Sequence, residues 1–165
     1  MTSLPGDSDR AAVGAQLGRP ARSMLGVAHR CPCGLPDVVV TAPRLDDGTP
    51  FPTTFYLTCP AAVAAVGTLE SGGLMREMGA RLQADPALAA AYRRAHEDYL
   101  HRRSALGDVT EIAQTSAGGM PDRVKCLHAL LAHTLAAGAG VNPLGDEVLA
   151  AMPEWWQGGP CVAPP

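Results

Sequence analysis

The chain has 165 residues, which is enough for one domain with a sizeable core. Its 47% hydrophobic and 18% charged content favours a globular protein over a disordered one, and its net charge of −3 argues against a nucleic-acid-binding surface. No apolar stretch reaches the roughly 18 residues that cross a membrane. We therefore expect a cytoplasmic protein without a membrane-inserted segment.

Both ends of the chain are expected to lie outside the domain. Residues 1–22 are rich in Gly, Asp, Ser and Arg without a hydrophobic period, which predicts a mobile N-terminal arm. Residues 23–152 are expected to form a single globular domain. Residues 153–165 are expected to form a C-terminal tail, in which one of Trp155 and Trp156 packs back on the domain.

Two strands are predicted in the first third of the domain. Residues 37–42 contain three consecutive valines and are typical of a buried strand, which Pro43 ends. Residues 46–50 carry turn residues, and residues 51–58 are typical of a second strand. Together they predict a β-hairpin.

Helices are predicted over most of the remaining chain. Proline is favoured at the first position of a helix and aspartate or asparagine just before it, which marks three starts, at Pro60, Asp85-Pro86 and Asn142-Pro143. The predicted helices cover residues 61–69, 74–83, 86–104, 121–137 and a short segment after residue 143. One hairpin with four to five helices predicts a helix-rich α+β fold.

The cysteines form the main candidate metal site. Cytoplasmic cysteines are more often free, metal-bound or catalytic than paired in disulfides. Cys31, Cys33, Cys59 and Cys126 together suit a tetrahedral zinc ion, although the spacing of a zinc ribbon is missing. Alternatively, three of them, without Cys33, would hold an iron–sulfur cluster with one open iron. His29 is a reserve ligand for either metal.

His128 is a second reserve ligand. If the helix runs from residue 121 to 137, Cys126 and His128 project about 200° apart, which argues against a shared metal. A hydrogen-bonded helix histidine is the preferred interpretation of both His128 and His133.

The start of the same predicted helix is also a candidate anion site. Gly118 and Gly119 precede it, and Arg123 and Lys125 lie in its first turn, where backbone N–H groups favour a phosphate or carboxylate. A surface ion pair of Arg123 is the competing interpretation. A cation close to Cys126 would also lower the pKa of its thiol and make it a nucleophile.

Four motifs carry a resemblance to a known family. They are HRCPCG at residues 29–34, PFPTTFYLTCP at 50–60, GGMPDRVKCLH at 118–128 and NPLG at 142–145. The chain resembles the bacterial domain-of-unknown-function family 501, in its actinobacterial form, over about residues 23–152. The resemblance implies motif cysteines at Cys31, Cys59 and Cys126 and leaves Cys161 outside the site.

The resemblance implies no established activity. Some members of the family are labelled septum formation from their gene neighbourhood, so a cell-division protein is an expected partner. Three hypotheses follow, in this order: a cysteine-bound zinc or iron–sulfur site, a metal-free interaction protein linked to cell division, and a thiol- or anion-handling enzyme that uses the start of the central helix. Whether the protein is an enzyme stays open at this point.

Overall fold

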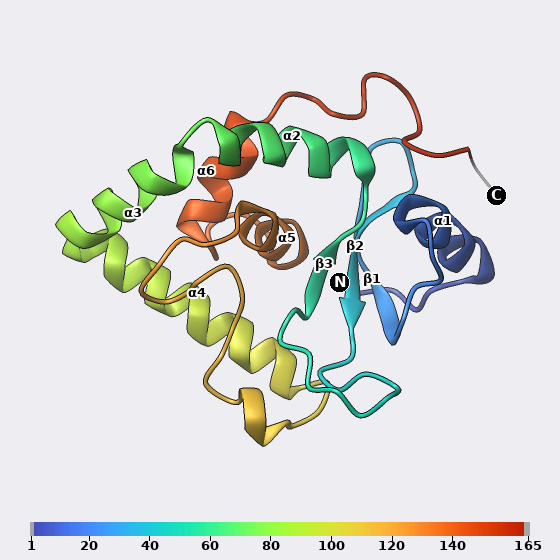
Figure 1. The fold of residues 1–165 in the computed structure, drawn as a ribbon, viewed down its shortest axis with the longest axis horizontal. Helices are drawn as coiled ribbons and strands as arrows, with labels where there is room; N and C mark the ends of the chain where they lie inside the picture. The colour runs from blue at the N-terminus through green and yellow to red at the C-terminus, as the bar shows by residue number, and fades with distance from the viewer. Residues whose placement is uncertain (1, 164–165) are drawn as a thin grey trace.

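The fold is a three-stranded antiparallel sheet with helices on both faces. A computed structural model describes residues 2–163. The strands β1 (Met24–Arg30), β2 (Pro36–Thr41) and β3 (Phe55–Leu57) lie side by side in that order. Figure 1 shows helix α1 on one side of the sheet and the other helices on the opposite side. The predicted helix-rich α+β class is confirmed.

The predicted hairpin is formed by β2 and β3, where Val38 lies opposite Leu57. The sequence analysis missed β1, which pairs with the other edge of β2 and leaves all of β2 buried. Gly26 in β1 is one reason, because glycine disfavours a strand on sequence grounds. Here it admits a neighbouring backbone: a Cβ at this position would lie 2.9 Å from the carbonyl oxygen of Ser3.

Six α-helices and one 3₁₀ turn surround the sheet. Their bounds are α1 (Asp7–Leu17), α2 (Pro60–Ser71), α3 (Leu74–Ala84), α4 (Pro86–Ser104), η1 (Thr110–Ile112), α5 (Leu127–Ala137) and α6 (Pro143–Ala151). The predicted caps are present, since Asp85 accepts the N–H groups of Ala87 and Leu88, and Asn142 accepts that of Gly145. Among the described residues, no helix combines the length and hydropathy that a bilayer crossing requires.

The N-terminal residues differ from the predicted mobile arm. Helix α1 lies against the sheet, where Val13 is fully buried with Met24, Val27 and Val39. Only a few residues of this helix reach the sheet, so its sequence shows no clear apolar period. At the other end of the chain, Trp155 packs against the main core, as predicted for one tryptophan of the tail.

Helix α5 is the centre of the larger core. It packs between the sheet and helices α2 and α6, and side chains of α4 contact its His133 (Figure 1). His133 in this helix is fully buried, and its ring nitrogens face the Asp98 carboxylate at 2.9 Å and the Asn142 amide at 3.3 Å. The interpretation of His133 as a hydrogen-bonded helix histidine is therefore confirmed.

Close packing of α6 on α5 generates a stability prediction. A Cβ at Gly145 would overlap the Leu130 carbonyl group, whereas a Cβ at Gly67, in α2, meets nothing within 4 Å. Gly145→Ala should lower the free energy of unfolding by about 1–3 kcal/mol because the two helices must separate. Gly67→Ala should raise it by about 0.5–1 kcal/mol through helix propensity. Urea denaturation of both variants checks the pair, and equal effects would contradict it.

Candidate functional site

Three side chains of different chemistry meet at the N-terminus of α5. One ligand atom each of Glu70, Cys126 and His128 lies within 4.8 Å of the other two. Cys126 is the N-cap residue, with extended backbone angles of φ −154° and ψ 108°. The expected 200° separation of Cys126 and His128 is therefore wrong, because the helix begins after Cys126.

A folded loop replaces the first six residues of the predicted central helix. The N–H groups of Arg123 and Lys125 donate to the carbonyl oxygens of Gly119 and Gly118, 2.9 and 2.7 Å away. Both glycines have positive φ, and a Cβ at Gly119 would lie 2.6 Å from the Arg123 carbonyl oxygen. These loop bonds take up backbone donors that a helix would use, so the helix starts at Leu127.

Glu70 joins the last turn of α2 to the first turn of α5. Its Oε1 atom accepts the N–H group of Leu127 at 2.7 Å and faces Nδ1 of His128 at 3.1 Å. The carboxylate thus accepts an N–H group that has no partner within the helix. Its negative charge also interacts favourably with the positive end of the helix dipole. The sequence analysis missed Glu70. The available signal was that Glu70 is the only charged residue of α2.

Each ring nitrogen of His128 faces an oxygen atom that can accept a hydrogen bond. Nδ1 faces Glu70, and Nε2 faces the carbonyl oxygen of Val63 at 3.2 Å. A neutral imidazole carries one N–H group, so it satisfies one of the two acceptors. The geometry therefore calls for a second proton on the ring or for a cation between Nδ1 and the carboxylate. The neighbouring Cys126 sulfur, with Glu70 adding to it, raises the pKa of His128 to about 9.

Two neighbours of Cys126 favour the deprotonated form of its thiol. The side chain of His128 lowers the pKa of the Cys126 thiol, against the opposing effect of burial. The backbone N–H group of Ala129 in the first turn of α5 acts in the same direction. The cluster thus brings a thiol with a lowered pKa and a carboxyl group to one imidazole.

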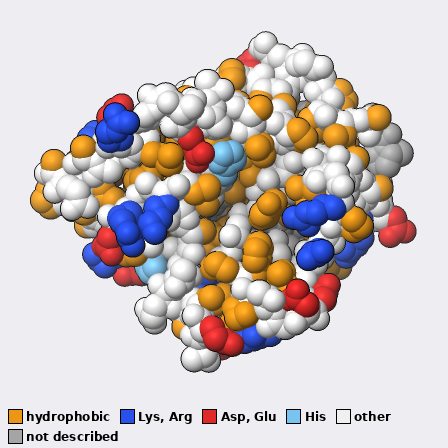
Figure 2. Space-filling model, in the orientation of Figure 1, with side chains coloured by type: hydrophobic (Ala, Val, Ile, Leu, Met, Phe, Trp, Pro, Cys, Tyr) orange, Lys and Arg blue, Asp and Glu red, His pale blue; other side chains and the backbone are white. Residues whose placement is uncertain are grey.

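Cys126 and His128 line a pocket of about 460 Å³. The other lining residues are mostly apolar or small: Pro52, Thr53, Phe55, Tyr56, Leu57, Val63, Ser116, Ala117, Gly118 and Ala129. Figure 2 shows a face whose hollowed middle is lined by hydrophobic side chains, with a histidine and an acidic side chain at the border. The size is typical of a small-molecule site.

Hydrogen bonds from two buried side chains of α4 hold the loops that form one wall of the pocket. Arg103 donates to the carbonyl oxygens of Pro52 and Thr115, and His96 bonds the hydroxyl of Ser116 at 2.8 Å. From its place in the charged stripe of α4, Arg103 would be expected in solvent, yet it is only 4% exposed. The carbonyl groups of two loops account for this, since they solvate the buried guanidinium.

The four predicted metal cysteines do not converge. Among the described residues, no three of the sulfurs of Cys31, Cys33, Cys59 and Cys126 lie within 4.8 Å of one another. Cys31 neighbours Cys33, and burial raises the pKa of its thiol to about 11. The predicted set therefore lacks the geometry of a zinc site. Cys126 lies instead beside Glu70 and His128.

Cys59 has Cys161 as its neighbour, a residue that the sequence analysis left outside the site. Burial raises the pKa of the Cys59 thiol to about 12, and the Cys161 side chain adds to the shift. The Gln16 amide donates to the Cys161 sulfur at 3.3 Å, which ties the tail to α1. The helix start predicted at Pro60 is confirmed and makes Cys59 the N-cap residue of α2, where burial outweighs the effect of the helix terminus on its thiol.

The other predicted residues have separate roles. His29 bonds the buried carboxylate of Asp37 at 2.7 Å within the sheet. Arg123 and Lys125 are exposed on the loop before α5. They do not lie in a helical turn, because α5 begins at Leu127, six residues after the predicted start at residue 121. The helix N-terminus that was expected to help Arg123 and Lys125 bind an anion is therefore not beside them.

The fold and the Glu70–Cys126–His128 cluster define a small α+β protein with one mixed-ligand polar site. Residues 27–150 match the model of a family described as "Protein of unknown function (DUF501)", and the chain belongs to this family. The resemblance found in the sequence is thereby confirmed. Comparison with curated proteins and with solved structures found no match.

The charge arrangement predicts an unusual reactivity of Cys126. In chelator-treated protein, Cys126 should react with iodoacetamide at lower pH than an ordinary cysteine does, because His128 lowers the pKa of its thiol. His128→Gln removes that charge, so the reaction profile should move to higher pH. Peptide mass spectrometry after timed alkylation measures this, with the buried Cys59 as an internal slow thiol. A profile that stays in place in His128→Gln would contradict the pairing.

Proposed function

We propose that Glu70, Cys126 and His128 bind one zinc ion and that the chain is a zinc-dependent enzyme acting on a small, mostly apolar substrate. The observation that carries this proposal is the meeting of one oxygen, one sulfur and one nitrogen donor within 4.8 Å. Zinc accepts all three donor types, and three protein ligands leave a fourth position for water or substrate.

The surroundings of the three ligands support a metal. With a cation bound, the Nε2–H group of His128 would donate to the Val63 carbonyl oxygen, and the Nδ1 lone pair would be free to bind the cation beside Glu70. A metal-binding histidine commonly has such a partner on its other nitrogen. The Leu127 N–H group holds Glu70 in the same way. A divalent cation would also balance the thiolate and the carboxylate.

The adjoining pocket supports a catalytic rather than a structural role. Both Cys126 and His128 line this pocket, so a zinc ion held by them would border space for a ligand. A zinc ion held there would supply a Lewis acid and would lower the pKa of a bound water to about 7, which suits hydrolytic chemistry. The apolar lining favours an uncharged substrate body, and the Thr53 side chain lies on the same wall.

The donor set favours zinc over an iron–sulfur cluster at this site. Iron–sulfur clusters depend on cysteine thiolates, and the cluster of ligands here contains one, together with a carboxylate and an imidazole. Mixed oxygen, nitrogen and sulfur donors are typical of zinc sites.

A second candidate function uses the same residues without a metal. Cys126 lies at a helix N-terminus, its pKa is lowered by His128, and Glu70 holds the imidazole. This arrangement is typical of a nucleophilic cysteine with an oriented histidine. In that case Cys126 attacks an electrophilic carbon of the substrate, and the His128 imidazolium returns a proton to the leaving group.

Metal analysis of the purified full chain tests the leading proposal. We expect about one zinc per chain in the wild type and less than a tenth of that in Cys126→Ser and Glu70→Gln. Glu70→Gln is informative because the amide oxygen still accepts the Leu127 N–H group, so the helix cap is kept while the charge is lost. Circular dichroism confirms folding of each variant.

Cys31→Ser is the matched control, since Cys31 is a buried cysteine outside the cluster. It should keep its zinc. Loss of zinc in Cys31→Ser would contradict the ligand assignment. A wild type that binds no zinc even after addition of zinc chloride, yet loses rapid alkylation in His128→Gln, would favour the nucleophilic cysteine instead.

A further inference from the structure

A second pocket lies on the other face of the sheet, away from the Glu70–Cys126–His128 cluster. It has a volume of about 380 Å³ and is bounded by α1, the three strands and the loops that follow α1 and β2. Its lining residues are Val13, Leu17, Arg19, Ala21, Arg22, Met24, Val39, Thr41, Leu45, Phe51 and Tyr56. The volume falls within the range of small-molecule sites.

The base of this pocket is part of the smaller core. Val13, Met24 and Val39 are each at most 4% exposed, so the apolar floor is held in place by packing. Phe51 and Tyr56 form an aromatic pair at 6.5 Å between ring centroids on its side. A rigid floor with aromatic sides favours a flexible apolar ligand body, because burying apolar surface is favourable and costs the protein little rearrangement.

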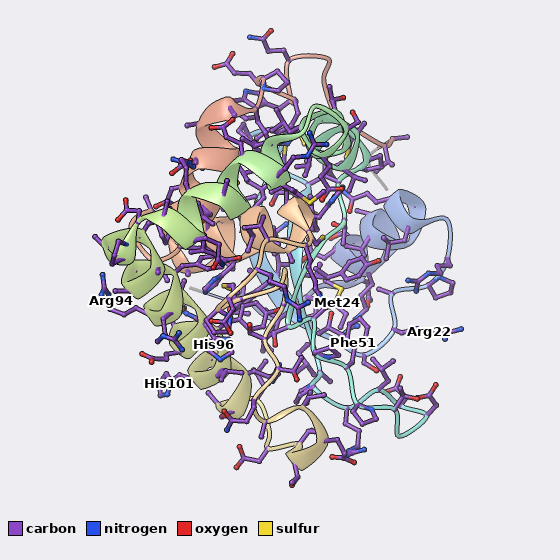
Figure 3. All side chains as sticks on the ribbon, turned by 60° about the vertical axis from the view of Figure 1, so that its left-hand side comes forward. Arg22, Met24, Phe51, Arg94, His96 and His101 are labelled. Carbon is purple, nitrogen blue, oxygen red and sulfur yellow. The ribbon has the colours of Figure 1, made fainter. Side chains whose placement is uncertain are left out.

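Two arginines give the pocket a positive charge. Arg19 and Arg22 are exposed, and no acidic residue is among the lining residues. Gly18 ends α1 in a left-handed conformation, with φ 66°, which turns the chain so that Arg19 follows directly at the pocket. In Figure 3, Arg22 projects outward to solvent, while Met24 and Phe51 lie closer to the interior on the same side of the molecule.

The two guanidinium groups are available to a ligand. Among the residues that the structure describes, neither Arg19 nor Arg22 forms a salt bridge. Arg22 is a minor cause of the lowered pKa of Asp47, and Asp46 and Asp47 line an adjoining pocket that shares Arg22 and Leu45 with this one. The net charge facing the apolar cavity is therefore positive.

We propose that this pocket binds a small anionic amphiphile: a medium-chain carboxylate whose alkyl chain lies on Val13, Met24 and Val39 and whose carboxylate faces Arg19 and Arg22. Guanidinium groups pair well with carboxylates, and the apolar floor matches the chain. The proposal is independent of the zinc site. Tyr56 alone lines both pockets, so the two sites are neighbours across β3.

Calorimetric titration of the full chain with decanoate, decanol and decylamine, each below its micellar concentration, tests the proposal. Decanoate should bind at least tenfold more tightly than decylamine, and its affinity should fall as salt is raised. Shortening the chain to octanoate should weaken binding, by about fourfold for each methylene removed. Equal affinities of the carboxylate and the amine would overturn the assignment.

Paired variants locate the site. Arg19→Ala together with Arg22→Ala should weaken decanoate binding roughly tenfold and leave decanol binding unchanged. Arg94→Ala is the matched control, because Arg94 is an exposed arginine of α4 on the opposite side of the molecule (Figure 3), and it should bind decanoate as the wild type does. An equal loss in Arg94→Ala would show nonspecific charge binding and overturn the proposal.

Ala21→Phe gives a second, charge-neutral test. Ala21 is half-buried at the pocket, so a larger side chain there fills space that the alkyl chain would occupy. Binding of both decanoate and decanol should be lost while the thermal midpoint stays near that of the wild type. Unchanged binding in a folded Ala21→Phe protein would place the ligand elsewhere and overturn the proposal.

Discussion

The carboxylate of Glu70 at the N-terminus of α5 is the interaction on which the candidate site depends. It closes a helix end by accepting the Leu127 N–H group, and the same oxygen faces the ring of His128. One side chain therefore fixes the distance between two helices and the orientation of the imidazole. Cys126 is brought to the cluster because the loop bonds before it delay the start of the helix.

The charges of this cluster explain why it suits a cation. The carboxyl group of Glu70 and the thiol of Cys126 lie around one imidazole, and the Val63 carbonyl oxygen occupies the other side of the ring. A second proton on His128 satisfies this arrangement, and the neighbouring Cys126 sulfur together with Glu70 raises the pKa of His128 to about 9. A zinc ion would satisfy it in the same place, with a ligand position left next to an apolar pocket.

The sheet separates two environments with different chemistry. The face toward α5 carries the polar cluster and a pocket with small hydroxyl groups, while the face toward α1 carries an apolar pocket with two arginines. Helix α1 is essential to the second pocket, although its sequence predicts a mobile arm. The expected cell-division partner and the anion site on the loop before α5 stay predictions.

The sequence by itself determined the local features of this protein. Proline and capping residues set the starts of α2, α4 and α6, three valines marked β2, and the motif around Cys126 and His128 identified the family and part of the site. Only the tertiary structure decided which residues, distant in the sequence, contact one another. Glu70 lies 57 residues before Leu127, and Cys161 reaches Cys59 from the tail. Such pairings depend on how helices pack, and packing leaves little signal at a single position of one sequence.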